Sequence, residues 1–370
     1  MENNPLRIII SGGGTGGHIF PAISIANALR ELRPDAEILF VGAQGRMEME
    51  RVPQAGYPIE GLPICGFDRK HLLRNVGLPY KIWQSSRRVK RIIKTFKPHV
   101  AVGVGGYASF PTLAAAAQMH IPCLIQEQNS FAGKTNKMLG KSAQKICVAY
   151  SNMERFFPAE KIMLTGNPVR QDLEPIRVSR AEALQHFDIP SDHRVLLVIG
   201  GSLGARTINR SLLAGIDALA AQPKLTVIWQ TGKLYLNEIQ QALNSMTNAS
   251  NIRLHGFLNR MDMAYAAADA VISRAGACSI SELCLVGRPA ILVPSPNVAE
   301  DHQTHNARAL ADRQAALMIA DADAPEQLTQ QAIALINDEA LRVQLSQNAL
   351  QMATPRSAHI IAQQVLNLCK

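Results

Sequence analysis

Three glycine-rich segments of this chain each follow a short apolar run and precede a helix-like stretch. They are Ser-Gly-Gly-Gly-Thr-Gly-Gly at 11–17, Gly-Gly-Tyr at 105–107 and Gly-Gly-Ser-Leu-Gly at 200–204. A turn in this position presents peptide N–H groups and the positive end of a helix dipole to a phosphate or diphosphate. One such turn can be a plain tight bend, but three together favour a protein that binds diphosphates in both of its halves.

The other nucleotide-binding patterns are incomplete. Residues 12–17 match G-x-G-x-x-G, but a dinucleotide site also needs an acidic residue at the end of the second strand, which here reads Phe-Val-Gly-Ala-Gln at 40–44. The chain also lacks the G-x-x-x-x-G-K-[ST] loop. A nucleotide-sugar glycosyltransferase that needs no metal or other cofactor agrees best with this combination. Helix N-termini, Ser202, Arg206 and Arg170 are then the groups that can hold the leaving diphosphate.

Alternating β and α signals indicate how these turns are positioned. Apolar runs predict strands at 6–10, 38–41, 99–104, 122–125 and 146–149, and again at 195–199, 227–230, 252–255, 270–273 and 290–294. We expect a helix that Pro21 could start and another over 205–219. The fold class is therefore α/β, with two doubly wound parallel-sheet domains, residues 1–167 and 168–354, facing a cleft. A final helix at about 355–370 could pack on either domain.

Composition excludes several classes of protein. Of the 370 residues, 47% are hydrophobic and 18% are charged, which is enough apolar material for large cores and excludes a disordered chain. The six cysteines include no C-x-x-C pair, and the chain begins without a signal peptide, so we expect reduced cytosolic thiols. The uncharged stretch 100–119 is long enough to span a bilayer, but its internal glycines and Pro111 favour a buried strand, turn and helix.

The positive charge of the chain is local. The net charge is +9, and segment 69–97 alone holds ten basic residues and no acidic one, so the rest carries −1. Among the apolar residues that stand between these cations, the candidate membrane contacts are Leu72, Leu73, Leu78 and Trp83. The three leucines are expected in a loop that precedes a helix. These candidate contacts predict a surface that enters anionic lipid, and the alternative is a solvated basic face. A stripe from Ile82 to Phe96 has helical spacing and is expected in the core.

Six motifs occur in a fixed order along the chain. They are Gly-Gly-Thr-Gly-Gly-His-Ile-Phe-Pro at 13–21, the turn at 105–107, Glu-Gln-Asn at 127–129, Gly-Asn-Pro-Val-Arg at 166–170, Gly-Gly-Ser-Leu-Gly-Ala-Arg at 200–206 and Arg-Ala-Gly-Ala at 274–277. This succession resembles the MurG family of bacterial N-acetylglucosaminyltransferases over nearly the whole chain.

The resemblance implies a fold, a reaction and a location. The fold is glycosyltransferase B, which has two Rossmann-like domains. The first binds the acceptor and attaches to the membrane, and the second binds UDP-GlcNAc. The reaction is inverting transfer of N-acetylglucosamine from UDP-GlcNAc to the 4-hydroxyl of the muramoyl sugar of lipid I. It gives lipid II for peptidoglycan synthesis, and the enzyme is peripheral on the cytoplasmic face of the inner membrane.

Carried over position by position, the resemblance also implies a binding site. The expected UDP-GlcNAc contacts are Thr15, Gly16, Gly17, Asn129, Arg170, Ser202, Leu258, Ala277, Cys278, Ser279, Ile280, Ser281, Glu282 and Gln303. The expected acceptor-diphosphate contacts are Gly14, Gly105, Gly106 and Tyr107. The chain departs from many relatives at Cys278, usually an apolar residue, and at His302, usually a second glutamine, which puts a sugar contact at 302 in doubt.

The identity of the general base stays open at the level of sequence. His18 follows the first glycine turn and can be neutral near pH 7, so it is the first candidate, unless it only bonds the loop or a phosphate. Glu127 is the second candidate, and its alternative role is to order the loop of Asn129. Glu282 has a rationale of its own, because a carboxylate early in a helix after a strand can accept both ribose hydroxyls.

Other functions remain to be compared with this one. A UDP-GlcNAc 2-epimerase or a different glycolipid-forming transferase could use the same fold, although an epimerase has no need of the basic apolar segment. A nucleic-acid-binding protein is disfavoured, because only 5% of residues are aromatic and no RNP, zinc-finger or helix-turn-helix pattern occurs. A homologue that has lost activity is the last alternative.

Overall fold

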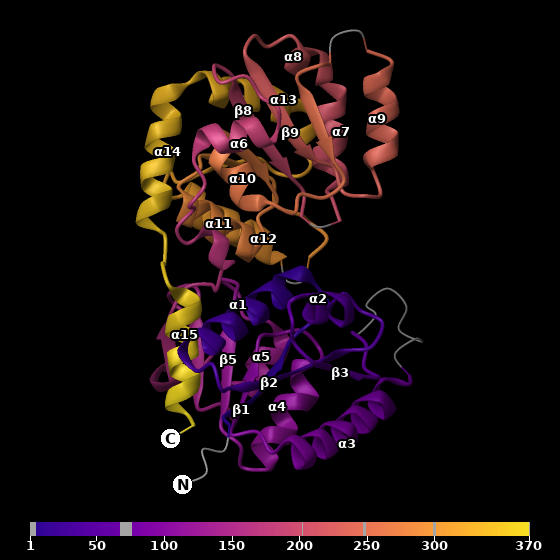
Figure 1. Cartoon of the computed structure of the whole chain (residues 1–370), viewed down its shortest axis with the longest axis vertical. Helices are drawn as coiled ribbons and strands as arrows, with labels where there is room; N and C mark the ends of the chain where they lie inside the picture. Colours follow the sequence, from indigo (N-terminus) through magenta and orange to yellow (C-terminus); the bar gives the residue numbers. More distant parts are fainter. Residues whose placement is uncertain (1–4, 67–75, 202, 247–248, 299–300, 370) are drawn as a thin grey trace. The chain divides into compact units, whose positions relative to one another are not determined.

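The computed structural model describes residues 5–66, 76–201, 203–246, 249–298 and 301–369. The chain forms two compact units, unit 1 (Met1–Arg170 and Thr354–Lys370) and unit 2 (Gln171–Ala353). In each unit a parallel β-sheet carries helices on both faces (Figure 1). The α/β, doubly wound fold class expected from the sequence is confirmed.

Unit 1 contains a seven-stranded sheet in the order β3-β2-β1-β4-β5-β6-β7. Its strands are β1 (Arg7–Ser11), β2 (Glu37–Ala43), β3 (Ile59–Leu62), β4 (Val100–Gly103), β5 (Cys123–Glu127), β6 (Lys145–Val148) and β7 (Ile162–Leu164). All neighbours pair in parallel, and β1 lies between β2 and β4. The strand order reverses beside β1, and ligands of open α/β sheets bind at the carboxyl ends of the strands at such a point.

Helices bury both faces of this sheet because successive residues of β1 point to opposite sides. Ile8 and Ile10 pack under α1 (Gly16–Leu32), α2 (Glu48–Gln54) and α15 (Ser357–Asn367). Ile9 packs under α3 (Leu78–Phe96), α4 (Ser109–Gln118) and α5 (Lys134–Leu139). The C-terminal helix α15 therefore belongs to unit 1, where it packs against α1. Contrary to expectation, α1 begins at Gly16, and Pro21 lies inside it.

Unit 2 contains a six-stranded parallel sheet in the order β10-β9-β8-β11-β12-β13. Its strands are β8 (Arg194–Ile199), β9 (Leu225–Gln230), β10 (Ile252–His255), β11 (Ala270–Ser273), β12 (Ala290–Leu292) and β13 (Leu317–Met318). One face packs against α7 (Arg206–Ala214), α8 (Ile216–Ala220), α9 (Leu236–Asn244) and α13 (Ala324–Asn337). The other packs against α6 (Arg180–His186), α10 (Met261–Ala267), α11 (Ala277–Val286) and α12 (His302–Ala311), and α14 (Glu339–Gln351) contributes to both clusters.

The single helix expected over 205–219 is wrong, because the segment forms two helices separated at Gly215. A Cβ atom on Gly215 would lie 2.4 Å from Oγ1 of Thr329 in α13. The chain therefore passes from α7 to α8 against Thr329 of α13, and only glycine fits there. Sequence periodicity does not show this contact because Thr329 is distant along the chain.

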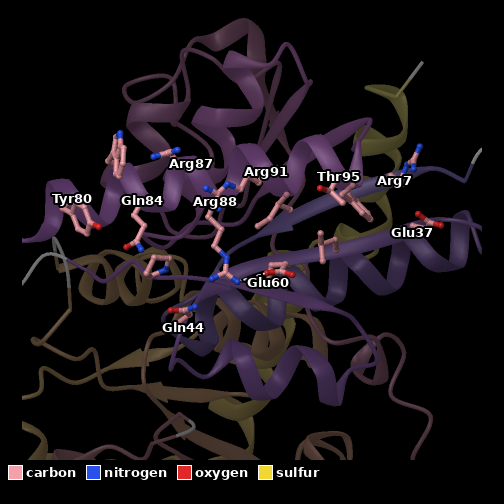
Figure 2. A pocket seen from close by; sticks show the side chains of 15 residues that line it. Arg7, Glu37, Gln44, Glu60, Tyr80, Gln84, Arg87, Arg88, Arg91 and Thr95 are labelled. Carbon is pink, nitrogen blue, oxygen red and sulfur yellow. Dashed lines mark hydrogen bonds and ion pairs between the residues drawn. The ribbon is translucent and has the colours of Figure 1, made fainter.

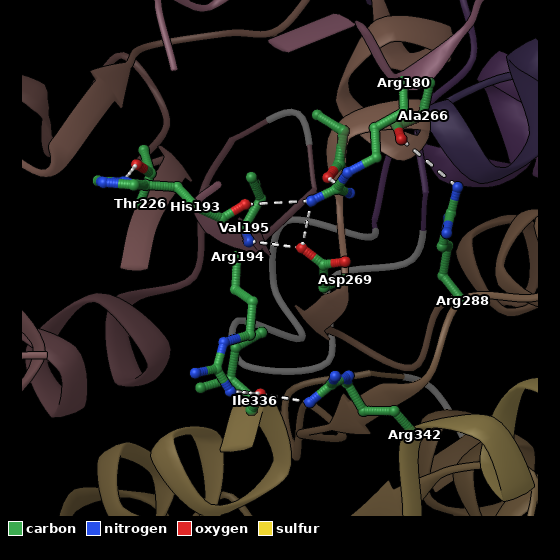
Figure 3. A network of polar contacts seen from close by, with 11 residues as sticks. Arg180, His193, Arg194, Val195, Thr226, Ala266, Asp269, Arg288, Ile336 and Arg342 are labelled. Carbon is green, nitrogen blue, oxygen red and sulfur yellow. Dashed lines mark hydrogen bonds and ion pairs between the residues drawn. The ribbon is translucent and has the colours of Figure 1, made fainter. Parts of the chain in front are cut away.

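Half-buried arginines at the amino-terminal end of the unit 2 sheet serve the fold rather than a ligand (Figure 3). Arg180 pairs with Asp269 at 2.8 Å and donates a 2.6 Å hydrogen bond to the carbonyl of Ala267, at the end of α10. Arg194 donates to the carbonyl of Ile336, in the last turn of α13, at 3.0 Å. These guanidinium groups satisfy helix C-terminal carbonyls, which have no intrahelical partner.

Candidate functional site

In unit 1, the turns at 11–17 and 105–107 touch at the carboxyl ends of β1 and β4. Gly105 and Gly106 have φ angles of +91° and +80°. A Cβ atom on Gly106 would lie 2.2 Å from the carbonyl oxygen of Gly13, and one on Gly105 would lie 2.7 Å from Cδ2 of His18. Glycine is therefore required at both positions by conformation and by space, and the two turns form one unit of structure.

His18 has a defined orientation in this pair of turns. Its Nδ1 lies 3.2 Å from Oγ1 of Thr15, and its ring packs on Gly105. When Nδ1 carries the proton and donates it to Thr15, Nε2 holds a lone pair that can accept a proton from a hydroxyl. The geometry thus permits the general-base role expected of His18.

Gly14 does not offer its N–H to a diphosphate as the sequence suggested. This N–H donates to both carboxylate oxygens of Glu48, at 3.2 and 3.1 Å. A buried protein carboxylate thus takes this N–H, and the acceptor-diphosphate contact expected of Gly14 stays a prediction that would need another atom of the residue. Glu48 was not singled out from the sequence, since it stands 34 residues after Gly14.

Tyr107 packs its ring against the same turn. A Cβ atom on Gly14, which has a φ of +90°, would lie 3.0 Å from Cε1 of Tyr107. Burial raises the pKa of Tyr107, and Arg46 partly opposes the shift. Tyr107 therefore remains a neutral phenol at physiological pH, and its ring helps to fix the first turn.

Glu127 fits the ordering role better than the role of a base. Oε1 accepts from the backbone and side-chain nitrogens of Asn129, at 3.1 and 3.3 Å. Oε2 accepts from the N–H of Gly133 at 3.0 Å and from Nδ2 of Asn136 at 2.9 Å. Burial raises the pKa of Glu127, and these four donors oppose the shift. Both oxygens are thus engaged in holding the loop that presents Asn129.

A buried amide network connects this loop to the motif at 166–170. Gln126 Nε2 donates to Asn167 Oδ1 at 3.1 Å, and Asn167 Nδ2 donates to the carbonyl of Gln128 at 3.0 Å. Three residues after Asn167, the guanidinium carbon of Arg170 lies 5.6 Å from the ring centroid of Phe20 in α1. Arg170 is thereby brought to the helix that begins after the first glycine turn.

In unit 2, the turn at 200–204 is held by Gln230, the last residue of β9, which the sequence reading missed. Its Nε2 donates to the carbonyl of Gly201 at 3.0 Å, and its Oε1 accepts from the N–H of Leu258 at 2.9 Å. Gln230 is 5% exposed, so both bonds are shielded from water. The Leu258 N–H is therefore taken, and Leu258 can offer its carbonyl. Ser202 lies outside the described residues.

The start of α11 gathers most of the other predicted donor contacts. Gly276 precedes the helix in an extended conformation and, as a glycine, supplies no side-chain cap. Glu282 is 8% exposed and accepts a 3.1 Å hydrogen bond from the hydroxyl of Tyr265. Ile280 points into the core, so only its backbone can meet a ligand. The remaining members, Ala277, Cys278, Ser279 and Ser281, lie in the first two turns.

Two further contacts fix the surroundings of α11. Arg274 pairs with Asp321, which also accepts from Oγ1 of Thr207 at 3.0 Å. Gln303, in the first turn of α12, accepts from the N–H of Ser295 at 2.9 Å through Oε1. Its amide nitrogen is then the group that can approach a sugar hydroxyl. His302 is half-buried at the start of the same helix.

A groove of about 970 Å³ lies beside α3 in unit 1, away from the glycine turns (Figure 2). Figure 2 shows Arg87, Arg88 and Arg91 projecting from α3, with Arg88 reaching Glu60 at 3.0 Å. At one end of the groove the exposed rings of Tyr80 and Trp83 stack at 5.9 Å between centroids. This face combines cations with exposed aromatic rings.

The structure revises the predicted membrane contacts on this face. Leu78 was expected in a loop but is the first residue of α3, where it is half-buried. Trp83 is 53% exposed, and Leu72 and Leu73 lie outside the described residues. Within the described parts of the chain, none of the helices has the length and hydropathy needed to cross a bilayer.

Family models match most of the chain. Residues 8–148 match the glycosyltransferase family 28 N-terminal domain, and residues 195–364 match the glycosyltransferase family 28 C-terminal domain. The chain belongs to glycosyltransferase family 28. The first segment covers strands β1 to β6 of unit 1, and the second covers the sheet of unit 2 and part of α15.

Several curated proteins resemble the chain over nearly their full length. A protein of Bacteroides thetaiotaomicron is 56% identical over 99% of this chain and 98% of its own length. One of Bacteroides fragilis is 54% identical over 100% of this chain and 97% of its own. Both are named UDP-N-acetylglucosamine–N-acetylmuramyl-(pentapeptide) pyrophosphoryl-undecaprenol N-acetylglucosamine transferase.

Solved structures agree with this family assignment. Acinetobacter baumannii MurG superposes with a TM-score of 0.76 at 29% identity and covers 98% of this chain and 100% of its own. A kitacinnamycin glycosyltransferase (TM-score 0.69, 13% identity) covers 99% and 100%. A Listeria monocytogenes protein titled as a putative UDP-N-acetylglucosamine 2-epimerase (TM-score 0.67, 13% identity) covers 98% and 95%. The last two share the fold alone.

Proposed function

We propose that this chain transfers N-acetylglucosamine from UDP-N-acetylglucosamine to N-acetylmuramyl-(pentapeptide) pyrophosphoryl-undecaprenol, which yields lipid II. The observation that carries the proposal is 56% identity, over 99% of the chain, to a relative with that name. The glycine turns and the two parallel sheets agree with a nucleotide-sugar transferase.

Unit 2 is the proposed site of the donor. The N–H groups at the start of α11 face the place where the UDP diphosphate binds, which supplies positive potential without a metal ion. Glu282 accepts the ribose hydroxyls, and the carbonyl of Leu258 accepts from the uracil ring. The amide nitrogen of Gln303 donates to the sugar. The proposed diphosphate contact of Ser202 follows from the family resemblance.

Unit 1 is the proposed site of the acceptor and of proton transfer. Inversion requires one displacement, in which the 4-hydroxyl oxygen bonds to C1 of the sugar while the bond from C1 to the UDP oxygen breaks. His18 Nε2 takes the hydroxyl proton, and Thr15 holds the ring through Nδ1. General-base assistance of this kind contributes ~10²–10⁴-fold to a rate. Arg170 stabilises the charge that develops on the diphosphate.

The test is a transfer assay on the purified full chain. Labelled UDP-N-acetylglucosamine is combined with lipid I or a short-chain analogue, and UDP-glucose and UDP-N-acetylgalactosamine serve as controls. We expect a labelled disaccharide product with the first donor alone, and no requirement for added metal. Release of an epimerised UDP-sugar without acceptor would instead favour the epimerase, whose fold this chain shares.

We further propose that the face of α3 attaches unit 1 to anionic lipid at the cytoplasmic side of the inner membrane. Exposed aromatic rings next to arginines are suited to the interface, and each basic residue near an anionic surface adds ~1 kcal/mol. The acceptor of the reaction carries a polyprenyl chain, so the enzyme must work at a membrane.

Vesicle sedimentation tests this attachment. We expect binding that rises with phosphatidylglycerol content, falls with salt and weakens in Trp83→Ala. Leu164→Ala is the matched control, because Leu164 is a similarly exposed apolar residue in β7, at the other edge of the same sheet. Equal binding to neutral vesicles, or equal losses in the two variants, would refute the proposal.

A further inference from the structure

Glu48 is a fully buried carboxylate at the start of α2 whose described hydrogen bonds all come from peptide N–H groups. The N–H of Gly14 donates to its two oxygens, at 3.2 and 3.1 Å, and the N–H of Ala43 donates to Oε1 at 3.0 Å. Glu48 therefore joins the first glycine turn to the carboxyl end of β2. A carboxylate in the first turn of a helix also faces the positive end of the helix dipole.

The space for this side chain comes from two glycines, one on each of the segments that it joins. Neither Gly13 nor Gly42 is among the residues with positive φ, so backbone conformation does not explain them. A Cβ atom on Gly13 would lie 2.1 Å from Oε1 of Glu48, and one on Gly42 would lie 2.6 Å from its Cγ. Both glycines thus form a cradle for one carboxylate.

The occupant of this cradle changes what the turn can bind. In a dinucleotide-binding fold, the peptide N–H groups of the corresponding turn approach a pyrophosphate. Here Glu48 accepts the N–H of Gly14 instead. An anion placed on that N–H would have to displace a carboxylate that is 0% exposed and would lie beside its negative charge. The centre of the turn is consequently closed to phosphate.

The residues that follow the turn show what this arrangement achieves. Gly14 directly precedes Thr15, whose hydroxyl lies 3.2 Å from Nδ1 of His18. We propose that Glu48 is a positioning residue of the transfer reaction, which fixes the first turn so that Thr15 and His18 keep one orientation. This inference rests on the proposed function and on the role of His18 in it.

Two substitutions at position 48 separate charge from shape. Glu48→Gln keeps the volume but turns a donor, its NH₂ group, toward a peptide N–H, whereas Glu48→Asp shortens the side chain and keeps an acceptor-only group. We expect kcat to fall by ~10–100-fold in Glu48→Gln, since misplacing a reacting group by about 1 Å costs a factor of that order. The KM for UDP-N-acetylglucosamine should change by less than about twofold, and Glu48→Asp should recover part of kcat.

The kcat values are normalised to the concentration of UDP-binding sites, so that unfolded protein does not lower the measured rate. Glu50→Gln is the matched control, because Glu50 is an exposed carboxylate on the same helix, and it should behave as the wild type. Glu48→Gln with wild-type kcat, or with higher kcat than Glu48→Asp, would overturn the inference, because shape alone would then suffice. Inactive wild-type protein would refute the proposed function, which is a different result.

A second measurement tests the inference even if neither variant folds, because it uses the wild-type chain. Amide hydrogen exchange of the wild-type chain should show the Gly14 and Ala43 amides protected as strongly as the amides of β1. Rapid exchange at Gly14 would show that its N–H is not held by Glu48 and would overturn the inference directly.

Discussion

The glycine turn at 11–17 in unit 1 and the turn at 200–204 in unit 2 look alike in sequence but are held in opposite ways. In the first, the carboxylate of Glu48 accepts a peptide N–H, that of Gly14. In the second, the amide of Gln230 donates to a peptide carbonyl, that of Gly201. The first support consumes a group that would bind an anion, and the second does not. The same pattern can therefore serve proton transfer in one unit and diphosphate binding in the other.

The largest expected effect concerns the base beside the first turn. His18→Ala should lower kcat by ~10²–10⁴-fold, because it removes the group that accepts the hydroxyl proton. UDP binding by calorimetry should stay within about threefold of the wild type, since the proposed contacts to uracil and ribose lie in unit 2. An unchanged kcat would show that His18 is not the general base. It would also contradict the proposal that the first turn serves proton transfer.

The next effect concerns the donor in unit 2. Glu282→Gln should weaken UDP binding by roughly 10–100-fold, because hydrogen bonds to a charged group contribute ~1.5–3 kcal/mol. The glutamine can still accept from Tyr265, so the fold of α11 is kept. Calorimetric titration with UDP measures the loss, and Glu238→Gln, at an exposed position on α9, is the control. Wild-type affinity in Glu282→Gln would place the ribose elsewhere.

Gln230→Ala tests the support of the second turn. The substitution removes the bonds to Gly201 and Leu258 and leaves a buried carbonyl and a buried N–H to find new partners. We expect a loss of ~1–3 kcal/mol in the free energy of unfolding and weaker UDP binding. Denaturant unfolding checks the first value, and Gln240→Ala, exposed on α9, should cost far less.

Thiol labelling compares the two units with little perturbation. Cys65 and Cys369 in unit 1 and Cys278 in unit 2 are partly exposed, whereas Cys123, Cys147 and Cys284 are buried. We expect a disulfide reagent at pH 8 to modify the three partly exposed thiols, with UDP slowing the reaction at Cys278 alone. Peptide mass mapping gives the sites. Protection of Cys65 by UDP, with none at Cys278, would contradict the proposal that the donor binds in unit 2.

The smallest effect is a loss of stability at alkaline pH. Burial raises the pKa of Cys123, Cys147 and Cys284 to about 12 each, from an ordinary value of 9.0. Above pH 9 the unfolded chain loses these protons while the folded chain keeps them, so folding becomes less favourable as the pH rises. Denaturation midpoints at pH 8 and pH 10 measure the difference, which should shrink in Cys147→Ala.

Sequence patterns identified the elements that are long and strongly apolar and missed those that depend on distant contacts. The core strands β1, β4 and β8 were predicted within one or two residues because their side chains are buried on both faces. The edge strands β3 and β7, of four and three residues, carry too few apolar side chains to stand out. The start of α1 was predicted too late, at Pro21. The break between α7 and α8 at Gly215 was not predicted.

The candidate site shows the same limit. The ordered motifs located the turns, but the residues that hold those turns, Glu48 and Gln230, lie on other elements. The only sign of the Glu48 contact is that Gly13 and Gly42 are glycines although neither has a positive φ. A sequence does not show φ, so this sign could not be used. The loop predicted for Leu78 was likewise overruled, because the apolar stripe of α3 continues to its first turn.

Hydrogen exchange of the full chain with and without UDP-N-acetylglucosamine tests the division between the two turns most directly. The account predicts slower exchange at the start of α11 and at residues 203–206, with Gly14 and Ala43 equally protected in both states. Slowing confined to residues 12–17, with α11 unaffected, would contradict it, because the nucleotide diphosphate would then lie on the turn that Glu48 is held to close.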